Sequence, residues 1–187
     1  MGRKDETGAA QAIIIMGVSG SGKSTLATLL GRQLDCPFFE GDSFHSEANV
    51  EKMRGGEPLT DADRWPWLDM LGQAIGTAVD REGVAVAACS ALKRVYRDRL
   101  RVAIGAPTSF VLLETGREEL VRRINNRPGH YMPASLIDSQ LAILERPGAE
   151  ERAITLESML TPEEEAERVL QWLTASGAPV RRSAKAG

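Results

Sequence analysis

Cysteine and histidine are scarce in this chain, which contains two of each among 187 residues. Cys36 and Cys89 fall in apolar, strand-like runs, where a small buried thiol is expected rather than a disulfide or a pair of metal ligands. His45 and His130 lack a close third ligand, so together they make a poor metal site. These scarcities argue against a disulfide framework and fit the reducing environment of the cytoplasm.

Long apolar runs are also missing. No stretch approaches the length that spans a membrane, and residues 1–11 contain no apolar signal core. The net charge is -3 and the pI is about 5.5, so no global field favours nucleic acid or an anionic membrane. We therefore expect a cytoplasmic protein with no membrane partner and no nucleic-acid partner.

The most informative stretch that is present begins with an apolar, strand-like run at residues 12–16. The next eight residues match the G-x-x-x-x-G-K-S pattern, in which glycines let backbone N–H groups surround a polyphosphate. Lys23 would reach the outer phosphates, and the Ser24 hydroxyl would bind Mg²⁺. The pattern predicts a P-loop that binds ATP and Mg²⁺ through Gly17, Val18, Ser19, Gly20, Ser21, Gly22, Lys23, Ser24 and Thr25. A glycine-rich turn without a ligand is the alternative.

The rest of the chain alternates strand-like and helix-like segments, which predicts an α/β fold with a parallel sheet and right-handed crossovers. With 42% hydrophobic residues, one domain with a sizeable core is expected over residues 12–174. Residues 1–11 are expected to be a disordered lead-in, and 175–187 a flexible basic tail. The expected strands are residues 12–16, 37–40, 84–89, 109–114 and 153–156, and the expected helices include 66–80, 92–104, 117–124 and 134–145.

Several classes of protein contain a P-loop, and the sequence separates them. A guanine-reading N-K-x-D or T-K-x-D segment is missing, which argues against a GTPase, and the strand at residues 84–89 is not followed by a metal-holding Asp as in ATPase motors. A small-molecule kinase is therefore favoured. A kinase for a shikimate-like acid or for a nucleotide stays open, as does a non-catalytic ATP-dependent regulator whose helix at residues 93–101 binds a partner.

A kinase also needs a carboxylate near the acceptor hydroxyl and cations near the transferred phosphoryl group. Asp42 follows the second strand, at the sheet edge where ligands collect, although a turn aspartate is the simpler alternative. Arg122, Arg123 and Arg127 flank a Pro-Gly break, which is typical of a mobile lid at about residues 122–136, although each could be a solvated surface residue. The polar stretch at about residues 43–65 is interpreted as a substrate-binding insertion.

Beyond the P-loop, blocks from residue 13 to 172 resemble the gluconokinase family. The resemblance implies a three-layer P-loop kinase fold with a five-stranded parallel sheet, and ATP-dependent phosphorylation of D-gluconate to 6-phospho-D-gluconate, often by a homodimer. Ser46 replaces a proline that is common in the family, which we expect to alter only loop stiffness. The matching blocks are MGVSGSGK (16–23), GD-x-x-H (41–45), NVEKM (49–53), GEPLTD-x-DR-x-PWL (56–68), CSALK-x-x-YRD (89–98) and GHYM (129–132).

Gluconate carries one carboxylate and several hydroxyl groups, so its site requires a cation and many polar side chains. We expect Asp42 to orient the acceptor hydroxyl and Arg127 to stabilise the transferred phosphoryl group together with Lys23, while Arg123 contacts the nucleotide. A salt bridge at a helix start, or a solvated helix face, is the alternative for the cationic residues. The residues expected to surround gluconate are Asp42, His45, Arg64, Lys93, Arg97 and His130.

Overall fold

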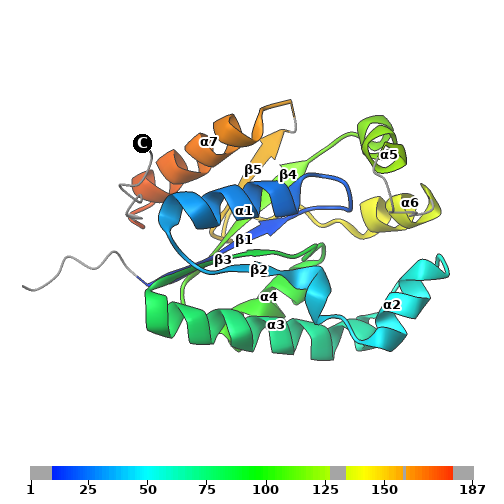
Figure 1. Cartoon of the computed structure of the whole chain (residues 1–187), viewed down its shortest axis with the longest axis horizontal. Coiled ribbons are helices and arrows are strands. Elements are labelled where there is room, and N and C mark those ends of the chain that lie inside the picture. The colour runs from blue at the N-terminus through cyan, green and yellow to red at the C-terminus, as the bar shows by residue number, and fades with distance from the viewer. Residues whose placement is uncertain (1–9, 127–133, 158, 179–187) are drawn as a thin grey trace, which may run out of the picture.

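The computed structural model describes residues 10–126, 134–157 and 159–178. Its centre is a sheet of five parallel strands in the spatial order β2-β3-β1-β4-β5 (Figure 1). This arrangement confirms the predicted α/β class and the five-stranded parallel sheet. The strands are β1 (Gln11–Met16), β2 (Phe38–Glu40), β3 (Val84–Ala88), β4 (Thr108–Glu114) and β5 (Ala153–Glu157).

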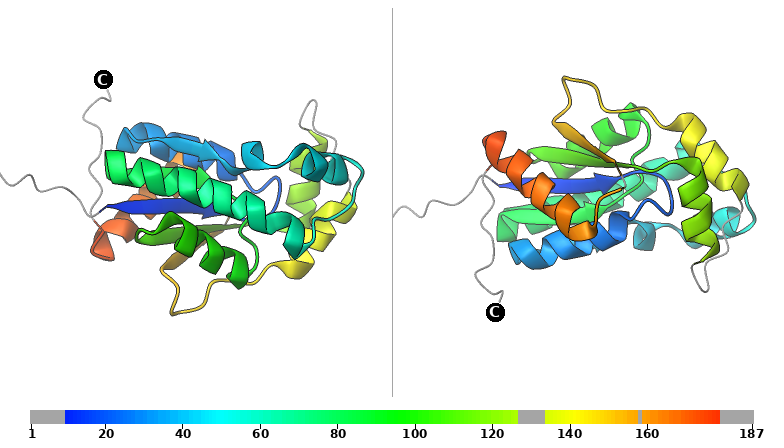
Figure 2. Two further views of the ribbon diagram at one scale, coloured as in Figure 1. Left: turned by 90° about the horizontal axis from the view of Figure 1, so that it is seen from below. Right: turned by 90° about the horizontal axis from the view of Figure 1, so that it is seen from above.

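Helices cover both faces of the sheet. They are α1 (Lys23–Leu34), α2 (Glu47–Arg54), α3 (Asp61–Glu82), α4 (Arg94–Ile104), α5 (Arg117–Asn125), α6 (Ala134–Ile143) and α7 (Pro162–Ala175), with a 3-10 helix η1 (Gly41–Phe44). α1 and α7 lie on one face of the sheet, and α3 and α4 lie on the other (Figure 2). Ile13 and Ile15 belong to the apolar core between the sheet and α1 and α7, whereas Ile14 and Met16 belong to the core between the sheet and α3 and α4. β1 is buried on both faces, which explains its uninterrupted apolar run.

The carboxyl ends of the strands gather the segments expected to bind ligands. The loop after β1, η1, α2, α5 and α6 all lie at this end of the sheet (Figure 1). After β1 the chain crosses to β2 on one side, while β4 lies on the other side of β1, so the strand order reverses here. Open parallel sheets bind ligands at such a reversal. A small apolar cluster that includes Val18, Leu120 and Ile137 attaches the loop to α5 and α6.

α3 is longer than the sequence predicts. A helix is expected over residues 66–80, whereas α3 begins at Asp61 and holds Pro66 in its interior. The Thr60 hydroxyl accepts a hydrogen bond from the Asp63 N–H, and the Asp63 carboxylate accepts one from the Thr60 N–H. Proline suits a first helical turn, but this capping box places the first turn further upstream. The predicted insertion therefore includes the start of α3.

Ser46 has a larger role than loop stiffness, which corrects that expectation. Its side-chain oxygen accepts a hydrogen bond from the Asn49 N–H at 3.2 Å, so Ser46 is the N-cap of α2. A proline at this position could not supply that acceptor. The Asn49 side chain in turn donates to the Asp63 carbonyl at 2.9 Å, which links α2 to α3.

The folded region extends beyond both predicted limits. Gln11, assigned to the lead-in, starts β1 and is 1% exposed. Its N–H donates to the Gly83 carbonyl at 2.9 Å and its side-chain amide donates to the Ala178 carbonyl at 3.4 Å. Ala178, assigned to the tail, is buried. Sequence polarity missed these residues because their burial depends on contacts between the two ends of the chain.

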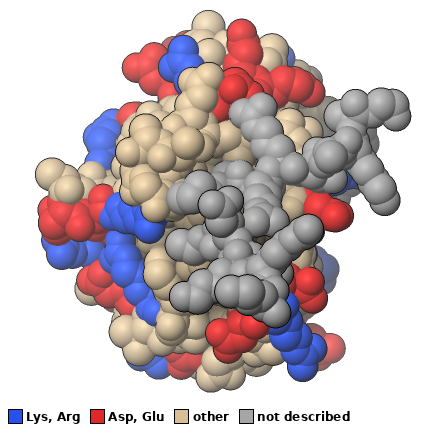
Figure 3. All heavy atoms as spheres, turned by 90° about the vertical axis from the view of Figure 1, so that its left-hand side faces the viewer, with Lys and Arg blue, Asp and Glu red and all other residues tan. Residues whose placement is uncertain are grey.

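Acidic and basic side chains alternate on the face that lies opposite the P-loop. Figure 3 shows both kinds around this face, outside the area that grey atoms cover. That mixture gives this face no charge of a single sign. Among the residues that the structure describes, no helix combines the length and apolarity required to cross a bilayer.

Candidate active site

The P-loop has the backbone geometry that its glycines predict. Gly17 has φ 144°, and a Cβ there would lie 2.8 Å from the Leu113 carbonyl oxygen, so a larger residue would not fit. Gly22, with φ 97°, is the N-cap of α1 and has no side chain to occupy the first N–H groups of the helix. These groups and the helix dipole favour an anion at this position.

Lys23 begins α1 and extends back across the loop. Its Nζ atom donates a hydrogen bond to the Val18 carbonyl at 2.9 Å. The Ser19 N–H donates to Gln140 Oε1 at 2.8 Å, and Gln140 Nε2 donates to Ser19 Oγ at 3.2 Å. α6 therefore supports the P-loop through Gln140, a contact that sequence analysis did not identify because 121 residues separate the two partners.

One cavity of about 640 Å³ joins the P-loop to Asp42. Asp42 lies in η1, directly after β2, and its side chain is 79% exposed. The structure thus brings together the predicted phosphate cradle and the predicted catalytic carboxylate. The cavity is lined by Ser19, Gly20, Ser21, Gly22, Lys23, Ser24, Thr25, Glu40, Asp42, Arg123, Ile124, Leu160, Pro162 and Glu165.

Cys89 lies beneath the site at the end of β3 and is buried. Burial raises the pKa of its thiol to about 12, and the charges of Asp42, Lys23 and Arg64 also act on it. Cys36 is also a free thiol, although it is only partly buried, and burial raises its pKa to about 11. Both thiols are unreactive at neutral pH, as expected of structural cysteines.

Arg123 lines the cavity from α5, as predicted for a residue that contacts the nucleotide. Its Nε atom donates to Glu119 Oε1 at 2.7 Å, and its Nη1 atom donates to the Ser21 carbonyl at 3.5 Å. Hydrogen bonds from Arg122 and Arg123 hold the pKa of Glu119 at about 2. The Arg122 side chain is 64% exposed, which agrees with the alternative that Arg122 is a solvated surface residue. Arg127 and His130 lie outside the described residues.

A second group of charges lies where α3 and α4 begin. Arg64 is 7% exposed, and its guanidinium carbon lies 5.1 Å from the centre of the Tyr96 ring. Lys93 Nζ lies 5.4 Å from the same ring centre and donates to Asp61 Oδ1 at 2.9 Å. The Tyr96 hydroxyl also donates to Asp61, and these two bonds lower the pKa of that carboxyl. Asp61 and Tyr96 were not predicted, because their roles depend on α3 meeting α4.

Arg64 retains hydrogen-bonding capacity within this group. Its Nη2 atom donates to the Leu59 carbonyl at 3.2 Å, while its Nε atom is buried and has no hydrogen-bond partner among the described residues. An unsatisfied guanidinium donor is costly to bury unless another group binds it. Arg64 and Lys93 thus place two cationic groups at the same aromatic ring, that of Tyr96.

The prediction that Arg97 contacts substrate is wrong. Its side chain is fully buried, and its Nε and Nη2 atoms donate to the Glu151 carboxylate at 2.7 and 2.8 Å. Its Nη1 atom donates to three backbone carbonyls, those of Ala91, Leu92 and Glu145. Lys93 lies just outside the same helix, because it is the N-cap of α4 and has an extended backbone. Arg97 is a structural residue.

His45 lies over Trp67 rather than in the open part of the cavity. The two ring centres are 4.1 Å apart with an angle of 22° between the planes, and the His45 side chain is 4% exposed. Burial lowers the pKa of His45. The negative charge of Asp42 raises this pKa, and the positive charge of Arg64 lowers it further. His45 is therefore neutral near pH 7 and exposes little surface to a ligand.

The start of α7 contributes to the cavity, although the sequence analysis named no site residue there. Thr161 and Glu164 form a capping box at this end of the helix. Glu165, however, lines the cavity with Leu160 and Pro162. The strand that precedes α7 is the feature of the sequence that could have indicated this position, because parallel strands all end at the same edge of the sheet.

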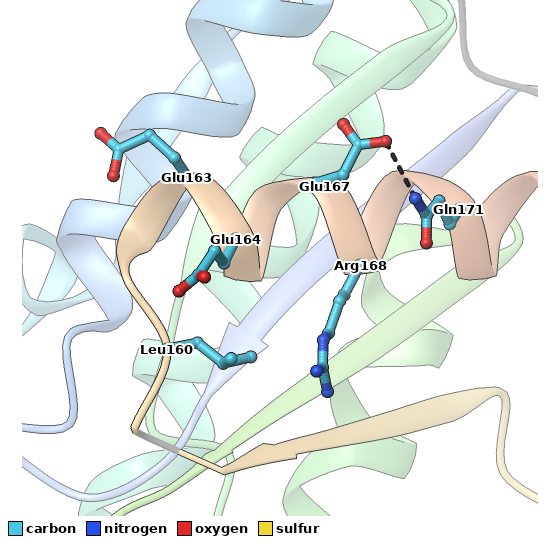
Figure 4. Close-up of a pocket in the computed structure, with 6 residues that line it drawn as sticks. All are labelled: Leu160, Glu163, Glu164, Glu167, Arg168 and Gln171. Atoms are coloured by element: carbon cyan, nitrogen blue, oxygen red, sulfur yellow. Dashed lines mark hydrogen bonds between the residues drawn. The ribbon is translucent and has the colours of Figure 1, made fainter.

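The outer surface of α7 carries a separate hollow (Figure 4), where Gln171 Nε2 donates to Glu167 Oε1 at 3.1 Å. Its carboxylates belong to a solvated helix face and to the helix cap. The lining residues are Leu160, Glu163, Glu164, Glu167, Arg168 and Gln171. Among the described residues no group of three or more His, Cys, Asp or Glu side chains could hold a metal ion.

A parallel sheet with a glycine-rich phosphate cradle, a facing carboxylate and neighbouring cations defines a P-loop kinase. Residues 13–147 match the AAA domain family. A gluconokinase from Gluconobacter oxydans is 46% identical over 163 residues, which cover 87% of this chain and 91% of that protein. The chain belongs to the gluconokinase family, as the sequence blocks predict.

Solved structures agree with this assignment. A gluconokinase from Sinorhizobium meliloti 1021 superposes with a TM-score of 0.80 at 39% identity, covering 90% of this chain and 94% of that one. A sugar kinase from Janibacter sp. HTCC2649 superposes with a TM-score of 0.82 at 41% identity, covering 92% of this chain and 99% of that one. The P-loop kinase fold is therefore confirmed.

Proposed function

We propose that this chain transfers the γ-phosphoryl group of ATP to D-gluconate and forms 6-phospho-D-gluconate. The observation that carries the proposal is the single cavity that contains both the P-loop and Asp42. Arg64 belongs to α3, which reaches the residue before Asp42 through the hydrogen bond from Trp67 Nε1 to the Gly41 carbonyl at 2.7 Å. A phosphate donor and an acidic polyol can thus bind next to each other, and the curated relatives of similar length are gluconokinases.

The P-loop residues Gly17 to Thr25 bind ATP, and the Ser24 hydroxyl would hold Mg²⁺. The fit is supported by the start of α1, because Gly22 at the N-cap has no side chain to occupy the first N–H groups of the helix. In phosphoryl transfer Mg²⁺ is held by few protein ligands and mainly by phosphate oxygens and water, so a cluster of carboxylates is not required. When bound, Mg²⁺ neutralises charge on the phosphate oxygens.

Arg64 and Lys93 are proposed to bind the gluconate carboxylate. Arg64 has an unsatisfied buried Nε donor, and Lys93 is held beside it by Asp61. A carboxylate at this position would place the far hydroxyl groups of the substrate toward Asp42 and the P-loop. His130 remains a predicted contact to those hydroxyl groups.

The reaction forms a bond between the acceptor oxygen and the γ-phosphorus while the bond from that phosphorus to the ADP oxygen breaks. Asp42 orients the acceptor hydroxyl and accepts its proton late in the reaction. Lys23 stabilises the charge that develops on the phosphoryl oxygens. Arg127 remains the lid arginine predicted to assist Lys23, and Arg123 contacts the nucleotide from α5.

A Lys23→Ala variant tests the role of the P-loop. We expect gluconate-dependent ADP release to fall by about 10²- to 10³-fold, because the variant lacks a preorganised charge at the transferred group. The measurement is a coupled ADP assay with and without gluconate. Near-normal turnover in the variant, or no gluconate dependence in the wild-type protein, would contradict the proposal.

An Asp42→Asn variant tests the carboxylate separately. The substitution keeps the size of the side chain but removes the proton acceptor, so we expect kcat to fall by about 10²- to 10⁴-fold. ATP affinity, measured by calorimetry, should stay within a few-fold of the wild type. A large loss of ATP affinity would show instead that Asp42 maintains the structure of the nucleotide site.

Three finer predictions accompany this function. A homodimer is expected from the family resemblance, and sedimentation of the purified chain measures it. The cytoplasm is the expected location, given the scarce cysteines. A panel of gluconate, shikimate and nucleoside monophosphates in the same ADP assay tests substrate preference, and faster turnover of another acceptor would replace gluconate.

A further inference from the structure

The backbone on which Asp42 sits is held tightly from two directions. A Cβ on Gly41 would lie 2.4 Å from the Ala88 carbonyl oxygen, so η1 is in close contact with the end of β3. On the other side, the indole Nε1 atom of Trp67 donates a buried hydrogen bond to the Gly41 carbonyl at 2.7 Å. The residue directly before Asp42 therefore has little freedom to move.

His45 completes this arrangement from the far end of η1. Its N–H donates to the Asp42 carbonyl at 3.3 Å, and its ring stacks on Trp67. The His45 Nε2 atom lies 4.0 Å from Asp42 Oδ1. A single buried indole, 2% exposed, thus supports both the backbone before Asp42 and the imidazole beside its carboxylate.

The surroundings of the two ring nitrogens indicate which of them carries the proton in the neutral His45 imidazole. Nδ1 of His45 is buried and has no hydrogen-bond partner among the described residues. A proton there would leave a buried donor unsatisfied, which costs more than an unsatisfied acceptor. The neutral ring therefore carries its proton on Nε2, the nitrogen that faces Asp42. Asp42 of η1 and Arg64 of α3 are the charged groups that act on this ring.

We propose that Trp67 and His45 are positioning residues, which hold the Asp42 carboxylate toward the acceptor hydroxyl rather than contact the sugar acid themselves. The proposal rests on the proposed function of Asp42 as the group that orients this hydroxyl. It also changes the predicted role of His45, whose 4% exposed side chain leaves little surface for a ligand.

The test compares His45→Leu, His45→Gln and Trp67→Phe with the wild type. Leucine removes the imidazole whose Nε2 atom lies 4.0 Å from Asp42 Oδ1, and we expect kcat to fall about 10- to 100-fold with a much smaller change in the KM for gluconate. Glutamine restores an N–H group near the position of Nε2, so His45→Gln should recover much of that loss. Phenylalanine keeps the stacking but removes the indole donor, so kcat should fall about tenfold.

Trp172→Phe is the matched control, because Trp172 packs against the core under α7 and lies outside the site. Its kinetics should equal those of the wild type. A second readout is independent of substrate: the position of the Asp42 carboxylate in crystal structures of the wild type and the variants without ligands. We expect the carboxylate to leave its wild-type position in His45→Leu, because the imidazole beside it is removed, and to return toward that position in His45→Gln.

Two results would overturn the inference: a higher gluconate KM with unchanged kcat in His45→Leu, or an Asp42 carboxylate that keeps its wild-type position in every variant. Failure of the proposed function is a separate outcome. It would appear as a wild-type protein that shows no gluconate-dependent ADP release, while the crystal structures still decide whether His45 and Trp67 position that carboxylate.

Discussion

At the scale of single residues, Glu165 shows how burial changes the chemistry of an ordinary side chain. It is 6% exposed and lines the nucleotide cavity from α7. Burial raises the pKa of its carboxyl from 4.5 to about 7, and the charge of Arg123 opposes this rise. The fold therefore favours the neutral form. The contribution of Glu165 to stability is lost as the pH increases from about 4.5 through about 7.

A Glu165→Gln variant should remove this pH dependence, since glutamine has nearly the same shape and cannot ionise. We expect the variant to gain stability relative to the wild type as the pH is raised from 5 to about 8. Urea unfolding at both pH values measures the difference. Glu163→Gln, at an exposed position of the same helix, is the control, and an equal difference at both pH values would refute the assignment.

At the scale of elements, buried charges attach α4 to the segment that precedes β5. Glu151 accepts hydrogen bonds from Arg97 and, at 2.8 Å, from Arg101 Nη2. Hydrogen bonding to Arg97 is the main reason that the pKa of Glu151 falls to about 2. Because the Glu151 side chain is 2% exposed, a loss of Arg97 would leave a buried charge whose remaining partners are the Gly148 N–H and the partly exposed Arg101.

Arg97→Leu should therefore destabilise the fold by about 3–5 kcal/mol, the usual cost of breaking a buried ion pair. Urea unfolding measures this loss. Arg99→Leu, on the same helix, removes a surface pair with Asp69 and should shift the unfolding midpoint far less. Equal losses of stability in the two variants would show that the buried pair of Arg97 and Glu151 stabilises the fold no more than the surface pair of Arg99 and Asp69 does.

The same cluster predicts behaviour in acid. Since the folded pKa of Glu151 is about 2 and its ordinary value is 4.5, its contribution to stability is complete above pH 4.5 and is lost as the pH falls toward 2. Glu151→Gln should show a shallower loss of stability across this window. Parallel acid titrations followed by circular dichroism check the slope, and equal slopes would contradict the assignment.

At the scale of the whole molecule, the sheet separates two apolar cores and leaves one edge for ligands. The cores on its two faces draw on alternate residues of β1, so the strand is anchored from both sides. The P-loop, η1 and the starts of α3 and α4 then meet at the carboxyl edge. A ligand at this edge contacts several elements at once and should stabilise the whole fold.

MgATP at 100 times its Kd should add about 2.7 kcal/mol of stability by mass action. For a chain of this size that corresponds to a rise in Tm of about 5–11 °C. Lys23→Ala should show a much smaller rise, which differential scanning fluorimetry can measure against the unliganded proteins. Equal shifts in both proteins would show that the stabilising nucleotide binds away from the P-loop.

The sequence by itself determined the P-loop, the parallel sheet and the family, because each depends on adjacent residues or on the regular spacing of apolar residues along the chain. The glycine pattern at 17–24 dictates a backbone shape, and the apolar run at 12–16 requires burial on both faces.

Only the tertiary structure decided which charged residues face the ligand. Arg97 and Lys93 are close in sequence but have different partners. Arg97 is buried in an ion pair with Glu151, whereas Lys93 forms an ion pair with Asp61, which lies at the start of α3. Glu165 lines the cavity because of the place that α7 takes in the fold. The physical reason is that burial and charge pairing depend on contacts between distant segments, and a local pattern carries no information on which segments meet.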